Sequence, residues 1–295
     1  MQNQEVAILT DNSLPIFEAA RAGFIHLREN LRASLIPALI TALAGAFLQF
    51  LVWQSPGWAL FLPLASALVS VPFLAGQYRR ALGLGGAGLR LGDDEASLAG
   101  ATLAIGFFTA ILLVIGGFFA LIAASIGLMA IGLDPKALSQ EPQAFLKAIG
   151  PSGSLVLLLC LTPLIVALAW VNARLVCFGA ASIAHKRIMA FSTWGWTKGS
   201  ASRIFSAGLL LAFPLAIGVI ITTATARAVL LGFGAEPAEM FASRPVPAFL
   251  ASAIEQFAGL VLLSGPMAGQ AAFLYRGFNP LGRNGDGAAP GNMLG

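Results

Sequence analysis

Charged residues are scarce in this sequence. Only 10% of its 295 residues are charged and 58% are hydrophobic, whereas ordinary soluble domains have about 25% charged and roughly 45–50% apolar residues. A chain of this composition has too little polar surface to cover a water-soluble fold. The composition therefore excludes a soluble globular protein and predicts an integral membrane protein.

Cysteine and histidine are also scarce. The two cysteines, Cys160 and Cys177, lie in apolar runs without a CxxC spacing, and buried inert thiols are expected. The two histidines, His26 and His185, have no Asp or Glu at a metal-ligand spacing. We expect both to lie at the membrane surface near lipid headgroups. The sequence thus predicts no catalytic, cofactor-binding or metal site, and no enzyme activity.

Long hydrophobic runs are abundant, and six of them reach the roughly 20 residues that a membrane-crossing helix needs. The predicted fold is all-α: a polytopic transmembrane helical bundle of about six spans, with amphipathic helices at the cytoplasmic interface. The spans are expected at residues 34–53, 57–77, 98–120, 153–173, 205–226 and 256–275. Together they make a single membrane domain over residues 13–275.

The two ends of the chain are predicted to be unstructured, and two of the apolar runs are unusually long. Residues 1–12 are expected to be a flexible N-terminus, and residues 276–295 a Gly- and Pro-rich disordered tail. The apolar runs 98–133 and 153–184 are longer than one crossing. The sequence leaves open whether these helices tilt, kink or extend into the interface.

Positive charge is distributed unevenly between the predicted spans. Twelve of the 17 Lys and Arg residues fall in alternate gaps and three in the others, with Arg174 and Arg227 at span ends. By the positive-inside rule both termini are cytoplasmic, and the mildly acidic outer gaps suit a bacterial inner membrane. Splitting the run 97–133 at Gly116-Gly117 would place the basic cluster 186–203 outside, so six spans are favoured.

Two hydrophilic segments are predicted to lie at the cytoplasmic interface. From residue 13 to 32, apolar and charged residues alternate at helical spacing, which predicts an amphipathic helix. A similar segment, 190–205, precedes the fifth span. Anchoring of the helix is one role for its aromatic and basic side chains, and contact with anionic lipid headgroups is the other. The candidate headgroup contacts are Trp194, Trp196, Lys198, Arg203, Lys186 and Arg187.

One pair of charges is predicted to meet at the opposite edge of the bundle. Arg227 ends the fifth span and Glu255 begins the sixth, so antiparallel packing would bring them to a similar depth. Charges at such depth are costly unless paired or hydrated. An ion pair marking a gate or a polar ligand site is one interpretation, and snorkelling of both side chains to the interface is the other.

Two stretches carry a resemblance to a known family. They are LPIFEAARAGFIHLRENLRASLIPALI (residues 14–40) and NARLVCFGAASIAHKRIMAFSTWGWTKGSASRIFSAGLLL (residues 172–211). The second has an Arg near a span end, a small-residue run and a Trp-x-x-Thr-Lys-Gly segment. This pattern resembles the membrane domain fused to some glycerophosphoryl diester phosphodiesterases and the YciC-type uncharacterised bacterial inner-membrane proteins. The resemblance implies a bacterial polytopic membrane protein. The phosphodiesterase activity belongs to a fused soluble domain, for which we expect no room here.

Two functional classes remain open after enzymes are set aside. The first is a non-catalytic bundle that organises, assembles or protects other membrane components. The second is a transporter or channel for a small or lipidic solute, although span centres are mostly apolar apart from Asn172, Gln256 and Gln270. Expected partners are the bilayer, anionic headgroups, and another membrane protein or a second copy of the chain. Nucleic acid is not expected, because the net charge of +4 follows from membrane orientation.

Overall fold

The computed structural model describes residues 15–55, 57, 61–85, 88–132, 142–232 and 243–279, with only the backbone described for 142–149. Within these ranges the protein is all-helical and no strand occurs, which confirms the predicted fold class. The helices are α1 (Ile16–Gln54), α2 (Leu62–Leu82), α3 (Asp93–Ala130), α4 (Pro142–Leu175), α5 (Phe178–His185), α6 (Ala201–Leu231), α8 (Pro245–Gly259) and α9 (Gly265–Phe278), with short elements η3 (Ser192–Trp194) and η4 (Leu260–Ser264).

Among the described residues, five helices are long and apolar enough to cross a membrane, which indicates a multi-pass membrane protein. They are Ile16–Gln54, Asp93–Ala130, Gly150–His185, Ala201–Leu231 and Pro245–Phe278. The predicted second span, 57–77, overlaps α2, which has 21 residues from Leu62 to Leu82 and is not one of the five. Its last turns hold Gln77 and two arginines inside the helix, so its apolar length is shorter than that of its neighbours.

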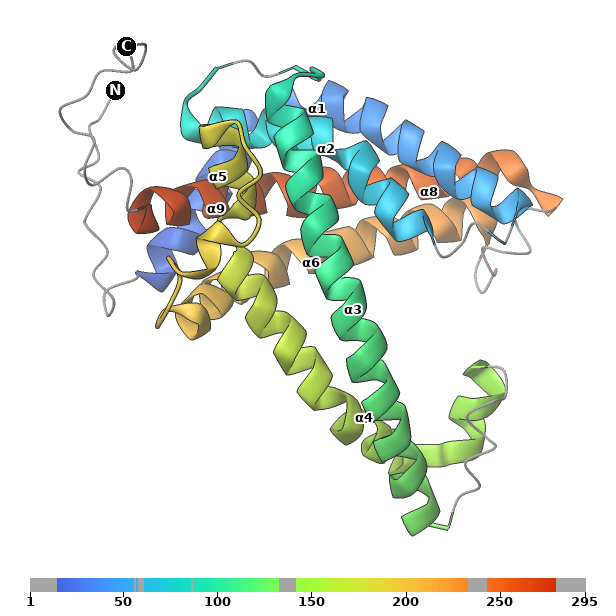
Figure 1. The fold of residues 1–295 in the computed structure, drawn as a ribbon. Helices are drawn as coiled ribbons and strands as arrows, with labels where there is room; N and C mark the ends of the chain where they lie inside the picture. Colours follow the sequence, from blue (N-terminus) through green and yellow to red (C-terminus); the bar gives the residue numbers. More distant parts are fainter. Residues whose placement is uncertain are drawn as a thin grey trace. The chain divides into compact units, whose positions relative to one another are not determined.

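The chain forms two compact units. Unit 1 comprises residues 1–103 and 173–295, and unit 2 comprises residues 104–172. In unit 1, α1 packs against α2, α6, α8 and α9, and α6 packs against α8 (Figure 1). The core of unit 1 consists largely of alanines from α1, α2, α4, α5, α6 and α9, packed with larger residues such as Tyr78 and Leu274, because close helix approach favours small side chains.

The predicted interfacial helix at residues 13–32 is not a separate element. Its described residues belong to α1, which runs without a break for 39 residues through the predicted first span and through Pro37. A helix of that length measures about 58 Å, against roughly 30 Å for the hydrocarbon core of a bilayer. Nothing between the amphipathic and the apolar parts ends the helix, so the two parts form one continuous helix.

In unit 2, α3 and α4 form a pair of long helices. α3 is continuous through Gly116-Gly117, which confirms one helix for the run 97–130 rather than two. A Cβ on Gly116 would lie 2.5 Å from Leu164 Cδ1, and one on Gly127 would lie 2.5 Å from Val156 Cγ1. The glycines on α3 therefore let α4 approach closely. α4 itself is kinked at Gly150, whose φ of 60° is left-handed and favours glycine.

The second predicted interfacial segment, 190–205, is also not a helix along its length. Ser192–Trp194 forms a single turn of 3-10 helix and turns follow until α6 begins. Gly199 has a φ of 85°, which interrupts helical geometry. The Thr197 hydroxyl donates a hydrogen bond to the Arg174 carbonyl at 2.8 Å. Gly199 and the hydrogen bond of Thr197 thus favour a folded loop over the expected amphipathic helix in this segment.

The sixth predicted span, 256–275, is interrupted by a π-helical turn, Leu260–Ser264. Pro266 follows closely, is fully buried, and lacks the N–H that would bond to the carbonyl of Leu262. The Gly265 N–H bonds instead to the Leu260 carbonyl, five residues back. Such turns occur often at functional sites. α9 then continues to Phe278, so residues 276–278, expected to belong to the tail, are helical. Residues 280–295 and 1–12 lie outside the described parts.

Candidate functional site

A proline in α1 creates the first element of a polar network in unit 1. Pro37 has no N–H to donate to the Ala33 carbonyl four residues earlier. Arg80 of α2 supplies the missing donor, with Nη2 at 3.0 Å from that carbonyl and Nη1 at 3.3 Å from Ser34 Oγ. Burial lowers the pKa of the Arg80 guanidinium from its ordinary value, but Arg remains protonated in proteins.

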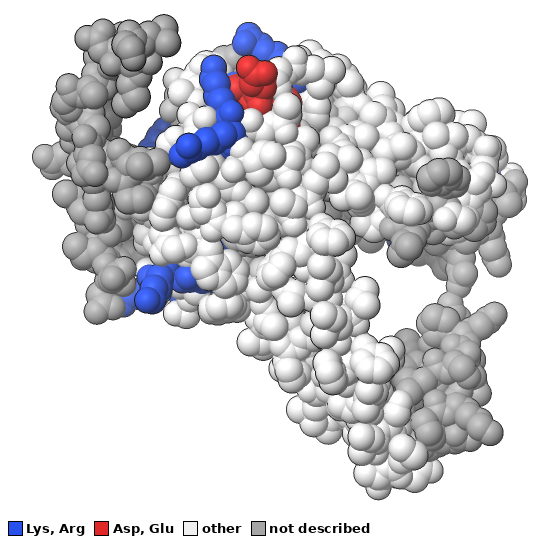
Figure 2. Space-filling view, in the orientation of Figure 1, with Lys and Arg blue, Asp and Glu red and all other residues white. Residues whose placement is uncertain are grey.

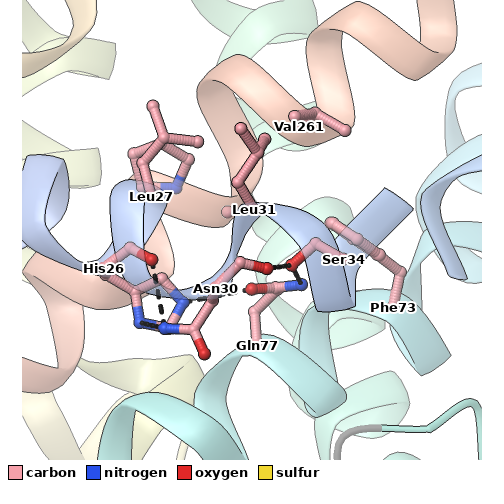
Figure 3. Close-up of a pocket in the computed structure, with 10 residues that line it drawn as sticks. His26, Leu27, Asn30, Leu31, Ser34, Phe73, Gln77 and Val261 are labelled. Carbon is pink, nitrogen blue, oxygen red and sulfur yellow. Dashed lines mark hydrogen bonds between the residues drawn. The ribbon is translucent and has the colours of Figure 1, made fainter. Parts of the chain in front are cut away.

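The network continues through the side chains of α1 that face α2 (Figure 3). Gln77 Nε2 donates to Ser34 Oγ at 2.8 Å, and Gln77 Oε1 lies 3.0 Å from His26 Nε2. Asn30 Nδ2 donates to the His26 carbonyl at 3.0 Å. His26 is only 7% exposed, so its predicted position at the membrane surface is wrong: α2 and α9 cover it. The adjacent cavity has a volume of about 10 Å³, which suits at most one water molecule.

A buried ion pair lies between α2 and the start of α3. Arg79 bonds to Glu95, and its Nη1 is 3.5 Å from Asp94 Oδ2. The side chains of Arg79 and Glu95 are only 6% and 5% exposed. Glu95 Oε2 also accepts a hydrogen bond from the Gly92 N–H at 3.0 Å, which caps the first turn of α3. This pair joins two helices and fixes the loop between them, so its role is structural.

A larger cavity, of about 200 Å³, lies between α1, α2 and the π-helical turn. A Cβ on Gly45 would lie 1.8 Å from Gln256 Oε1, so the Gln256 amide rests directly on the backbone of α1. Five of the eight lining residues carry a hydroxyl or an amide, and none of these described residues is charged. The lining consists of Thr41, Ser66, Val69, Ser70, Gln256, Gly259, Leu260 and Ser264. The arrangement suits binding of a neutral hydrogen-bonding group.

The ion pair expected from the sequence is present. Arg227 Nη2 of α6 lies 2.5 Å from Glu255 Oε2 of α8, and the two side chains are 47% and 44% exposed. The Ser252 hydroxyl of α8 donates to Gln49 Oε1 of α1 at 2.5 Å, which adds a polar contact on the same helix. The position of the pair at the outer edge of a membrane stays a prediction.

The candidate headgroup contacts are distributed over the loop between α5 and α6 and its ends. Lys186, Arg187 and Lys198 are exposed, whereas Trp194, Trp196 and Arg203 are half-buried. The Arg174 guanidinium lies 5.2 Å from the centre of the Trp194 ring, a cation–π contact. The Trp196 ring lies 6.1 Å from that of Tyr275. The two tryptophans therefore also serve to hold the loop against the bundle.

On the face drawn in Figure 2, Lys and Arg side chains gather over the end of unit 1 that holds the loops before α3 and α6. His185 of α5 belongs to this end, and its Nε2 lies 3.0 Å from the Tyr275 hydroxyl. Arg276 Nη2 donates to the Ala81 carbonyl at 2.5 Å. Contact of this basic end with lipid headgroups stays a prediction.

Sequence reasoning missed the buried network around His26 and the Arg79–Glu95 pair. One signal was present for the first: a proline in a helix frees the carbonyl four residues before it, and a neighbouring basic side chain often binds it. No signal in the sequence pairs His26 with Gln77, because 51 residues separate them. The cavity likewise combines residues of three separate segments.

The chain matches no protein family, no curated protein and no solved structure.

Proposed function

We propose that this protein is a non-catalytic bundle of a bacterial inner membrane that organises or assembles other membrane components. The observation that supports the proposal is the surface of α3 in unit 2. Phe107, Phe118 and Phe119 are all more than half exposed, and the rings of Phe118 and Phe119 stack edge-to-face at 5.9 Å. Aromatic side chains contribute strongly to protein interfaces, so α3 offers a surface to a neighbouring membrane protein.

The charged side chains of unit 1 named above take part in structural contacts, which is compatible with a non-catalytic organising role. Arg79 and Glu95 bond to each other, Arg80 binds a backbone carbonyl, and Arg227 pairs with Glu255. Each of these contacts stabilises packing between helices. The resemblance to the membrane domain of the phosphodiesterase-linked and YciC-type proteins also favours a membrane role without hydrolysis, because that activity belongs to a different domain.

Site-specific photo-crosslinking in cells tests the organising role. p-Benzoylphenylalanine is introduced at Phe119 of α3, which is 65% exposed, and at Phe213 of α6, which is 68% exposed, as the matched control. We expect a discrete, stoichiometric protein adduct from Phe119 and lipid adducts alone from Phe213. Lipid adducts alone at both positions, or the same mixture of proteins at both, would show that α3 has no dedicated partner.

A second candidate function is transport of a small or lipidic solute. It is favoured by the 200 Å³ polar cavity between α1, α2 and the π-helical turn, because discontinuous helices often line substrate sites in transporters. Uptake of a labelled neutral solute into proteoliposomes containing the full chain tests it. Uptake no faster than into protein-free liposomes would exclude this function.

A further inference from the structure

Most of the polar side chains around the 200 Å³ cavity take part in no hydrogen bond between the residues that the structure describes. In the part of the chain that the structure describes, the side chains of Thr41, Ser66, Gln256 and Ser264 form no hydrogen bond. Thr41 as a residue is only 5% exposed, and it lines the cavity. Ser70 alone uses its hydroxyl, which donates to the Ser66 and Ala67 carbonyls of its own helix.

Several hydroxyls elsewhere on the apolar helices bond to their own helix. Those of Ser125, Ser154, Thr162 and Thr222 each donate to the carbonyl four residues earlier, at 2.6–2.8 Å. A Ser or Thr hydroxyl in an apolar environment usually forms such a hydrogen bond to a carbonyl of its own helix. Of the cavity hydroxyls, Ser70 bonds to its own helix in this way, whereas those of Thr41, Ser66 and Ser264 do not. The hydroxyls of Thr41, Ser66 and Ser264 and the amide of Gln256 are therefore free to bond to a molecule that enters the cavity.

The backbone around the cavity is shaped to keep this space open. The π-helical turn Leu260–Ser264 carries Ser264 to the cavity wall, and Pro266 prevents ordinary helical bonding there. Gly45 lets Gln256 lie against α1. The amide of Gln256 offers both donors and an acceptor, and each hydroxyl offers one donor and two acceptor sites.

We propose that this cavity binds a small uncharged molecule, or molecular moiety, that bears several hydroxyl groups, such as a glycerol unit. The lining has no charge with which to recognise an ion, and 200 Å³ is well above the roughly 30 Å³ that one water occupies. The ligand is either a free polyol or the glycerol portion of a neutral lipid, since both present the same chemistry. The proposal does not depend on the organising role of the protein.

Thiol modification in the full chain tests the proposal. Cys160 and Cys177 are replaced by Ala, and a single cysteine is introduced as Ser264→Cys in the cavity or as Thr222→Cys on the surface of α6, the matched control. In liposomes, methyl methanethiosulfonate should modify the cavity cysteine at least tenfold faster, because a thiolate forms in a hydrated polar cavity and not against lipid tails. Ser66→Cys provides a second cavity position if Ser264→Cys does not fold.

Protection experiments then identify the source of the ligand. Glycerol at 1 M should slow modification of the cavity cysteine at least threefold relative to the control cysteine if the ligand is a free polyol. Dioctanoylglycerol in the bilayer should do so if it is a lipid. Adding Gln256→Leu should remove the protection in either case. Equal modification rates at the two cysteines, or no protection by either compound, would overturn the proposal.

Discussion

The Arg79–Glu95 pair provides the sharpest test of the fold, because the chain contains a second ion pair for comparison. The substitution Glu95→Gln keeps the shape of the side chain and removes its charge. Arg79, whose side chain is 6% exposed, then remains buried without its nearest carboxylate, while Asp94 lies 3.5 Å away and the Gly88 carbonyl 3.2 Å away. Removing one member of a buried pair typically costs about 3–5 kcal/mol.

The control is Glu255→Gln, which neutralises one partner of the Arg227 pair. Its side chains are 47% and 44% exposed, so the remaining charge is not enclosed by the protein. An exposed pair contributes about 0–1 kcal/mol. The two variants carry the same chemical change, so the difference in their effects isolates burial.

The assay is equilibrium unfolding of the purified full chain in mixed micelles, followed by helical circular dichroism. We expect Glu95→Gln to lower the free energy of unfolding by about 3 kcal/mol and Glu255→Gln to lower it by less than about 1 kcal/mol. Losses that are equal within error would refute the reasoning that the Arg79–Glu95 pair is buried and structural.

Three further predictions concern α1, α9 and the chain ends. Arg80→Met should destabilise the protein by about 1.5–3 kcal/mol. The loss should be much smaller in a Pro37→Ala background, because the Ala33 carbonyl then regains a helical donor. A double-mutant cycle in the same unfolding assay measures this coupling, and additive effects would contradict it. Gly269→Ala should lower the free energy of unfolding by about 1–3 kcal/mol, because its Cβ would lie 2.4 Å from His26 Cβ. The control is Gly208→Ala, which has open space at its Cβ and should be neutral or slightly stabilising in that assay. Reporters active only in the cytosol should function at both termini, and a silent reporter on an intact, expressed protein would contradict the predicted orientation.

Much of the secondary structure followed from the sequence, because hydropathy is a property of consecutive residues. Each of the six apolar runs proved helical where the structure describes it, and the run through Gly116-Gly117 proved to be one helix. The errors arose at boundaries. The segments 13–32 and 190–205 were both expected as interfacial helices, yet one merges into α1 and the other forms a loop. A single residue such as Gly199 can end a helix, and a hydropathy average over many residues does not detect it.

The candidate site was less predictable, since its contacts join distant segments. The Arg227–Glu255 pair was predictable because two successive antiparallel helices bring both residues to the same end. The Arg79–Glu95 pair was not, although only 16 residues separate its members, because its formation depends on the path of the loop between α2 and α3. His26 was assigned to the surface because α9, which packs over it, is more than 200 residues away in the sequence.

The sequence by itself determined that this chain is helical and belongs in a membrane, because scarce charge and long apolar runs leave no alternative in water. It also carried the asymmetry of charge from which the orientation is predicted. Only the tertiary structure decided which polar groups meet: Pro37 with Arg80, His26 with Gln77, and the cavity at the π-helical turn. Hydrogen bonds and ion pairs act over a few ångströms, so they depend on which helix faces the chain lays side by side.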